Sequence, residues 1–273
     1  MIKASFEYHA PTSADEAAEL VSSLEGETAV ISGGTWVVPE MTHGVRRPRH
    51  VVDLRQAGLA GVARENGSLV IGTTATYTDV FQAGAAGEIE ALETMVAGVT
   101  GGAQIHNQGT LGGSACYANP GSDAPGLLVG LDATLRLVRG NSRREVAAGD
   151  FFQDSFRTTL ESGELLTAIV VPVPPAGARS GYYKFKLNES SWPIATACCL
   201  ADAEGSVMRL AVGGVSPTPV VVEAAVGATH PDTVATAVGD TAFEPWSDAL
   251  ADGAYRRKIA HVVARRAYLA ATG

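Results

Sequence analysis

Two short stretches that pair adjacent glycines with hydroxyl side chains constrain this chain more than any other feature of its sequence. The first is Ser32-Gly33-Gly34-Thr35, which follows directly on the apolar run 28–31. The second is Thr110-Leu111-Gly112-Gly113-Ser114, which lies within a glycine-rich polar stretch at 101–120. Paired glycines let successive backbone N–H groups face one anion, because no Cβ keeps a phosphate away. The two stretches therefore predict either ordinary tight turns or the walls of a phosphate-containing ligand site.

The commonest nucleotide-binding motifs are absent from the sequence. No Gly-Lys dipeptide occurs in the 273 residues, which excludes a P-loop. No G-x-G-x-x-G occurs either, which excludes the dinucleotide fingerprint. The second stretch is the stronger candidate site, because a polar loop of about twenty residues in a compact domain is more often functional than structural. Ser122 or Asp123, just beyond it, is suited to begin a helix whose start helps to hold a pyrophosphate.

Charge and cysteine content limit the partners of such a site. The net charge is −9, from 20 Lys and Arg against 29 Asp and Glu, which argues against a nucleic-acid or anionic membrane surface. The N-terminal residues lack the pattern of a secretory signal, and no apolar run reaches the roughly 18 residues of a membrane-spanning helix. Three cysteines are too few for a disulfide framework. We therefore expect a soluble cytoplasmic protein without nucleic-acid partners or membrane insertion.

Side chains that carry hydrolytic or metal chemistry show no matching pattern. The six histidines have no H-E-x-x-H or paired spacing, so the sequence predicts no metal site. Cys198 and Cys199 are neighbours on a predicted strand and should face opposite sides of a sheet as core residues. Cys116 lies inside the second glycine stretch and is best interpreted as an inert small residue. No G-x-S-x-G is present, and nothing in the sequence suggests a Ser-His-Asp triad.

Hydrophobic periodicity predicts an α+β fold that begins with a small α/β lobe over residues 1–55. Ser13 and Glu16 form a capping box for a helix that ends before Gly26. Strands are predicted at 28–31 and 51–54. Residues 56–175 are predicted to form a larger lobe with a mixed sheet. Its expected elements are hairpins at Asn66-Gly67 and Gly140-Asn141, a helix at 88–99 and a strand at 165–171.

A segment rich in proline and glycine, 172–181, is the best linker candidate and places a domain boundary near residue 176. Three strands are predicted beyond it, near 182–187, 194–202 and 207–213. The chain is expected to end in an amphipathic helix. The arginines expected on its solvent face are Arg256, Arg257, Arg265 and Arg266.

Six segments carry a specific resemblance that covers nearly the whole chain. They are ISGGT at 31–35, PRHVVDL at 48–54, IGTTAT at 71–76, IHNQGTLGGSACYANPGSDAP at 105–125, YYKFK at 182–186 and GGVSPTP at 213–219. In this order and spacing they resemble the FAD-binding medium subunit of the molybdenum hydroxylases, the family of carbon monoxide dehydrogenase and xanthine dehydrogenase. Departures from the family pattern are Ser114 where many members have Asn, His106 where many have Arg, and Trp192-Pro193 in place of an Asp-containing segment.

The resemblance implies a two-lobed FAD-binding domain over 1–175, with lobes at about 1–55 and 56–175 and FAD extended between them. A smaller α+β C-terminal domain follows over 177–273. Both glycine loops are implied to grip the FAD pyrophosphate. The implied cofactor-binding residues are Ile31, Ser32, Gly33, Gly34, Thr35, Trp36, Thr110, Leu111, Gly112, Gly113, Ser114, Asp123, Leu166 and Lys184.

Three of these residues have separate implied roles. Asp123 corresponds to an aspartate that hydrogen-bonds the cofactor, Leu166 to a residue beside the isoalloxazine ring, and Lys184 to a basic residue near the pyrimidine end of that ring. A cation at that end suits the negative charge of a reduced flavin. FAD is expected to bind non-covalently, because no His or Cys lies in a recognised attachment motif. A bulky residue at Gly33 or Gly112 is expected to abolish FAD binding, through strain at positive φ or a clash with phosphate, with little loss of the fold.

The function implied by the resemblance is electron transfer in an oxidoreductase complex. Electrons would pass from an iron–sulfur small subunit to FAD on this chain and then to an external acceptor. Substrate would be oxidised at a molybdenum cofactor on a large subunit, in what is expected to be a dimer of heterotrimers. Three scattered cysteines agree with this division, because an iron–sulfur cluster usually takes four thiolates. The alternatives are a self-sufficient FAD-dependent oxidase and a flavin-free scaffold protein of the same fold.

Overall fold

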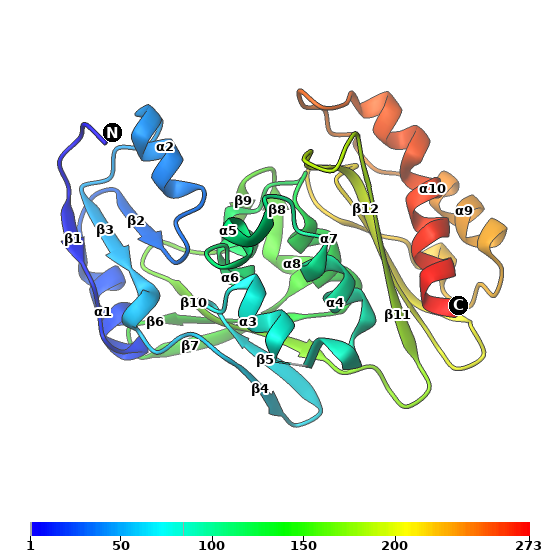
Figure 1. Cartoon of the computed structure of the whole chain (residues 1–273), viewed down its shortest axis with the longest axis horizontal. Coiled ribbons are helices and arrows are strands. Elements are labelled where there is room, and N and C mark those ends of the chain that lie inside the picture. Colours follow the sequence, from blue (N-terminus) through cyan, green and yellow to red (C-terminus); the bar gives the residue numbers. More distant parts are fainter. Residues whose placement is uncertain (1, 84) are drawn as a thin grey trace.

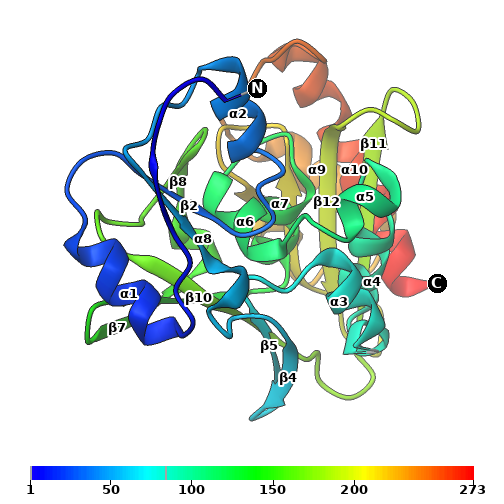
Figure 2. The same ribbon diagram turned by 60° about the vertical axis from the view of Figure 1, so that its left-hand side comes forward.

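The computed structural model describes residues 2–83 and 85–273 and shows an α+β protein built on three main sheets. The sheets succeed one another along the chain, from the N-terminal sheet at the left of Figure 1 to the C-terminal sheet at the right. In both views, helices α6 (Leu111–Tyr117) and α7 (Asp123–Gly130) lie between the N-terminal sheet and the C-terminal sheet (Figure 1, Figure 2). Among the described residues, no helix is both long and apolar enough to cross a membrane.

The N-terminal sheet is parallel and has the strand order β1-β3-β2. Its elements in chain order are β1 (Glu7–His9), α1 (Ala14–Ser23), β2 (Thr28–Ile31), α2 (Val37–His43) and β3 (His50–Asp53). The predicted small α/β lobe is thus confirmed, but the capping box is only half formed. Ser13 accepts a hydrogen bond from the Glu16 N–H, whereas the Glu16 carboxylate accepts from the N–H and hydroxyl of Thr12 instead of the Ser13 N–H.

The middle sheet is antiparallel throughout, where a mixed sheet was expected. Its strands in spatial order are β4 (Val62–Glu65), β5 (Ser68–Gly72), β10 (Leu165–Pro172), β6 (Thr134–Arg139) and β7 (Ser142–Ala147). Tight hairpins join two strand pairs, as predicted, and Asn66 and Gly67 adopt φ of 48° and 78° in one of them. Strand β10 then enters between the two hairpins and pairs antiparallel with β5 and with β6.

Helices cover this sheet and reach into the polar stretch that was expected to be a loop. They are α3 (Tyr77–Gln82), α4 (Glu90–Ala97), α5 (Gly102–His106), α6 and α7. The remaining short elements up to residue 158 are η1 (Leu54–Gln56), η2 (Ala85–Glu88), α8 (Ala148–Phe151) and the strand pair β8 (Phe152–Asp154) and β9 (Arg157–Thr158). Thr110 is the N-cap of α6, and its hydroxyl oxygen accepts a hydrogen bond from the Gly113 N–H at 3.0 Å. The second glycine stretch therefore forms the start of a helix.

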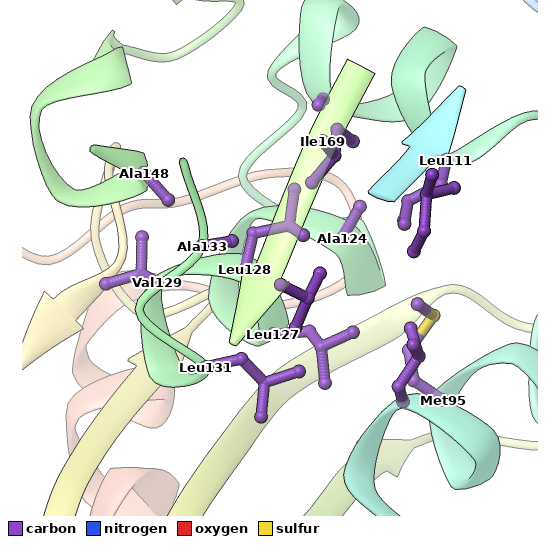
Figure 3. Packing of buried hydrophobic residues seen from close by; sticks show 14 of the residues in the cluster. Met95, Leu111, Ala124, Leu127, Leu128, Val129, Leu131, Ala133, Ala148 and Ile169 are labelled. Carbon is purple, nitrogen blue, oxygen red and sulfur yellow. The ribbon is translucent and has the colours of Figure 1, made fainter. Parts of the chain in front are cut away.

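Every residue of α7 is buried, which is why its sequence is apolar all round. Leu127 and Leu128 pack with Ile169 of β10, and Leu111 and Met95 belong to the same core (Figure 3). Because α7 begins at Asp123, the core that surrounds the helix also fixes the position of that carboxylate.

The C-terminal sheet has α7 on one face and two helices on the other. Its elements are β11 (Arg179–Lys186), β12 (Pro193–Ala201), β13 (Val207–Gly213), β14 (Val220–Val221), η3 (Glu223–Ala225), α9 (Pro231–Asp240) and α10 (Gly253–Thr272). Cys198 belongs to the core that contains α7, and Cys199 to the core that contains α10. Their predicted positions on opposite faces of one strand are therefore confirmed.

Arg256 is not on the solvent face of α10, contrary to the prediction. Its side chain is fully buried, and it donates hydrogen bonds to the carbonyl oxygens of Ile194 and Gly214 and to Asp248. Its guanidinium also lies 4.6 Å from the ring centroid of Trp246. Helical periodicity assigned Arg256 to the polar face, because a single sequence does not show which distant groups pack against the start of the helix.

Candidate cofactor-binding site

The two glycine stretches lie far apart in the sequence and meet in the fold. Residues 32–36 follow β2 in the N-terminal sheet, and Thr110 lies between α5 and α6 beside the middle sheet. A Cβ built on Gly33 would lie 1.7 Å from the carbonyl oxygen of Gln108, so only glycine lets the two backbones approach this closely. Contact between the loops therefore makes one groove from two distant segments.

The physical reason for these glycines differs from the expected one. Only Gly34 has a positive φ, 68°, in the two Gly-Gly pairs. A Cβ on Gly112 would lie 2.2 Å from the Thr73 hydroxyl oxygen, so this glycine is required by packing. The Gly113 N–H is already used by the Thr110 cap. The expectation that Gly33 and Gly112 could be enlarged with little loss of the fold is therefore wrong, because both contact neighbouring protein atoms directly.

A first cavity of about 220 Å³ lies between the loops and contains most of the residues predicted from the sequence. Those in its wall are Ile31, Ser32, Gly33, Gly34, Thr35, Trp36, Thr110, Gly112, Gly113, Ser114 and Leu166. Within the two glycine loops the exception is Leu111, whose side chain is fully buried in the core of the middle sheet (Figure 3). Leu111 therefore anchors α6 in this core.

A second cavity, of about 320 Å³, adjoins the first. Thr35, Trp36 and Ser114 line both cavities, and Asp123 and Trp192 line the second. The two cavities therefore form one extended groove with a shared middle. Leu166 lies at the first cavity and Asp123 at the second, so the structure does not bring these two predicted residues together.

Asp123 and Lys184 form a buried ion pair behind the second cavity. The Lys184 Nζ lies 3.0 Å from Asp123 Oδ1, and the two side chains are only 8% and 10% exposed. Lys184 also donates to the carbonyl oxygen of Gly98, and the Tyr182 hydroxyl donates to Asp123 Oδ1 at 2.7 Å. Burial, together with the adjacent carboxylate, raises the pKa of Tyr182 well above its usual value. Tyr182 is therefore a neutral hydrogen-bond donor at all physiological pH values.

Tyr117 and Trp192 line the groove but were not among the cofactor-binding residues predicted from the sequence. Trp36 stacks on Tyr117, with ring centroids 4.7 Å apart and planes 11° apart, and meets the edge of Trp192 at 5.0 Å. The Tyr117 hydroxyl donates to Glu40, and burial followed by this hydrogen bond raises its pKa to about 12. These aromatic side chains are separated by 156 positions at most (192 − 36), so only the fold reveals their contact.

Two polar features of the first cavity suit an anion. The Ser32 hydroxyl oxygen is buried at its wall and has no hydrogen-bond partner among the residues that the structure describes. Arg46 lines the same cavity with a side chain that is 37% exposed, and its Nε lies 3.3 Å from a Glu40 carboxylate oxygen. A hydroxyl group without a partner and a guanidinium group can both donate hydrogen bonds to phosphate oxygens. The run Arg46-Arg47 was the available sequence signal for the cation.

Cys116 lies in the wall of the groove, whereas His106, in α5, lines neither cavity. Cys116 lines the first cavity, but burial raises the pKa of its thiol to about 12, so the nucleophilic thiolate is scarce at neutral pH. The prediction of an inert residue at this position agrees with that environment. The His106 Nε2 is 2.7 Å from the carbonyl oxygen of Val99, which ties α5 to the end of α4.

Residues 4–174 match the family model described as "FAD binding domain in molybdopterin dehydrogenase". The chain belongs to this family. The match covers the N-terminal and middle sheets and includes every predicted site residue except Lys184. The resemblance stated from the six sequence segments is thereby confirmed.

Relatives in the molybdopterin dehydrogenase family match the chain along nearly its whole length. The carbon monoxide dehydrogenase medium chain of Afipia carboxidovorans is 34% identical over 98% of this chain and 96% of its own length. The glyceraldehyde dehydrogenase medium chain of Sulfolobus acidocaldarius is 28% identical over 93% and 95% of the two chains. These relatives are medium chains of oxidoreductases, and this chain is similar to them throughout.

Solved structures agree with the sequence comparison. A carbon monoxide dehydrogenase structure from Hydrogenophaga pseudoflava superposes with a TM-score of 0.92 at 30% identity, over 99% of this chain and 98% of that one. Quinoline 2-oxidoreductase from Pseudomonas putida gives a TM-score of 0.89 at 26% identity, over 100% and 98% of the two chains. The predicted α+β fold class is confirmed over the full chain length.

Proposed function

We propose that this chain is the FAD-binding electron-transfer subunit of a molybdenum-containing hydroxylase or dehydrogenase. In such a complex it passes electrons from an iron–sulfur subunit, through FAD, to an external acceptor. The observation that carries the proposal is the groove formed where two glycine loops meet, at the position where the family model describes a FAD-binding domain. Full-length similarity to the medium chains of carbon monoxide and glyceraldehyde dehydrogenases supports the same role.

The residues around the groove fit the chemical groups of FAD. We assign the pyrophosphate to the first cavity, where Ser32 and Arg46 offer hydrogen-bond donors beside the two glycine loops. We assign the flavin ring to the second cavity, where Trp36 and Trp192 offer flat apolar surfaces. When bound, FAD supplies the redox chemistry, and the protein needs no catalytic acid or base of its own.

Asp123 and Lys184 are positioning residues in this proposal. Asp123 is at the wall of the second cavity, where its carboxylate can accept a hydrogen bond from the cofactor. Lys184 and Tyr182 hold that carboxylate in place from behind. Because the lysine charge is already balanced by Asp123, the pair presents little net charge to a reduced flavin, and Lys184 acts mainly by fixing Asp123. Leu166 is proposed to contact the cofactor from the first cavity.

We propose that residues 1–175 form the FAD-binding domain, with lobes at about 1–55 and 56–175, and that 177–273 form a C-terminal domain. Each proposed unit contains one main sheet with its own packed helices. The extent of the family match, residues 4–174, supports the same boundary. The groove then lies between the two lobes of the first domain.

The proposed partners are an iron–sulfur small subunit and a molybdenum-cofactor large subunit, assembled as a dimer of heterotrimers in the cytoplasm. The environment of the cysteines supports this division of labour. Cys198 and Cys199 are buried on opposite faces of β12, and burial raises the pKa of both thiols. These thiols are poor cluster ligands, because cluster iron is held by thiolates. Free thiols also agree with a reducing compartment.

Purification of the chain alone and with its co-expressed neighbours tests this proposal. We expect the assembly to oxidise a substrate such as carbon monoxide, an aldehyde or an N-heterocycle in the presence of an artificial electron acceptor. The isolated chain should show no turnover with any of them, because the carboxylates that line the described groove, Glu164 and Asp123, are held in ion pairs with Arg144 and Lys184. Native mass spectrometry of the assembly should give two copies of each subunit. Substrate oxidation by the isolated chain would contradict the electron-transfer role and favour a self-sufficient oxidase.

A further inference from the structure

We propose a binding site for a divalent transition metal ion, of the zinc type, formed by Glu7, His9 and His50 on the N-terminal sheet. One ligand atom from each of the three side chains lies within 4.8 Å of the other two. None of the three lines the groove described above, so this inference is independent of FAD. The histidines show no metal-binding spacing in the sequence because they are 41 positions apart.

Strand pairing brings the three residues to one face of the sheet. Strands β1 and β3 are parallel neighbours, with Glu7 opposite His50 in the register. His9 lies two positions after Glu7, and side chains two apart on a strand point to the same side. The backbone therefore fixes the arrangement, and no loop movement is needed to gather the ligands.

The spacing of the ligand atoms matches tetrahedral coordination. His9 Nε2 lies 3.2 Å from His50 Nδ1, and that nitrogen lies 3.4 Å from Glu7 Oε2. Zinc–nitrogen bonds of about 2.0–2.1 Å place neighbouring ligands of a tetrahedron about 3.3 Å apart. Three protein ligands leave a fourth position for water, as in many zinc sites with an open coordination position.

One nitrogen of this cluster, His50 Nδ1, has two potential partners. His50 Nδ1 faces the His9 nitrogen and the Glu7 carboxylate at the same time. Nδ1 can donate a proton to one of these neighbours or accept one from His9 Nε2, but it cannot hydrogen-bond fully to both at once. A cation placed between the three atoms would accept electron density from all of them.

The environment of the cluster combines a fixed ligand with an accessible one. The His50 side chain is 12% exposed, whereas the Glu7 side chain is 74% exposed. Two imidazoles with one carboxylate select zinc, cobalt or nickel over magnesium or calcium, which prefer oxygen ligands. The bound ion would link the edge strand β1 to the central strand β3.

Cobalt and zinc titrations of the chain test the site. The chain is prepared without a histidine tag and freed of metal with a chelator. We expect one Co²⁺ per chain to bind at micromolar concentration with the visible absorption of a tetrahedral site, and one equivalent of Zn²⁺ to abolish that absorption. The melting temperature should rise with Zn²⁺ and return after chelation.

Ligand variants decide whether the signal comes from these residues. His9→Gln and His50→Gln should each weaken Co²⁺ binding by at least about tenfold, with an unchanged circular dichroism spectrum. The matched control is His230→Gln, because His230 also faces a carboxylate, at 3.7 Å, but without a second imidazole. It should leave binding unchanged. No saturable cobalt absorption, or equal binding by the His9→Gln, His50→Gln and unmodified chains, would overturn the proposal.

Discussion

Lys184→Met should lower the free energy of unfolding by about 3–5 kcal/mol, because it leaves the Asp123 carboxylate buried without its cation. The two side chains are almost fully enclosed, so little solvent is available to screen the remaining charge. The carbonyl oxygen of Gly98 also loses its donor. Denaturant unfolding followed by circular dichroism measures the effect.

A second substitution separates loss of the ion pair from loss of packing. Asp123→Asn in the Lys184→Met background removes the unpaired charge while it keeps an oxygen that can accept from Tyr182. We expect the double variant to recover most of the lost stability. Arg179→Met is the matched control, since it breaks an exposed pair with Glu90 and should cost less than about 1 kcal/mol. Equal stability of the Lys184→Met and unmodified chains would show that the pair is not formed.

Gly33→Ala should destabilise the chain by about 1–3 kcal/mol and remove most of its bound flavin. The added methyl group would lie 1.7 Å from the Gln108 carbonyl oxygen, so the two loops must separate by more than 1 Å to admit it. Separation of the loops opens the first cavity and displaces its donors from the cofactor. The flavin-to-protein absorbance ratio and the denaturation midpoint measure the two effects.

Gly239→Ala is the matched control for this substitution. Gly239 lies in α9, and a Cβ there meets no atom within 4 Å. Because alanine is the better helix former by up to about 1 kcal/mol, the control should be at least as stable as the unmodified chain and should keep its flavin. A Gly33→Ala chain with full flavin content and an unchanged midpoint would refute the close contact of the loops.

Short sequence patterns correctly predicted those turns and strands whose formation depends on neighbouring residues. The Asn66-Gly67 dipeptide predicts its hairpin because both residues tolerate positive φ, and strand β2 lies at the predicted residues. Arg256 was placed wrongly, because its burial depends on carbonyl groups at Ile194 and Gly214 that are distant in the chain. Periodicity reports which face of a helix is apolar and cannot report what covers the other face.

The candidate site was predicted only in part, because several of its contacts also join residues that are distant in the chain. The glycine loops are visible in the sequence, but the contact that requires Gly33 is with Gln108, 75 positions later (108 − 33). The stacking of Trp36 on Tyr117 and the pairing of Lys184 with Asp123 likewise join elements that are far apart in the sequence. Such contacts depend on how the sheets pack, and no spacing rule in a single sequence encodes them.

The most direct test of the proposed FAD-binding role is acid precipitation of the chain purified together with its co-expressed partners. Among the described residues that line the two cavities there is no histidine, and burial raises the pKa of the lining thiol, Cys116, to about 12, so it is a poor attachment point. We predict that the supernatant will contain one intact FAD for each chain and that the washed precipitate will be colourless. A supernatant and precipitate that both lack flavin, or yellow colour retained in the precipitate, would contradict the non-covalent FAD site.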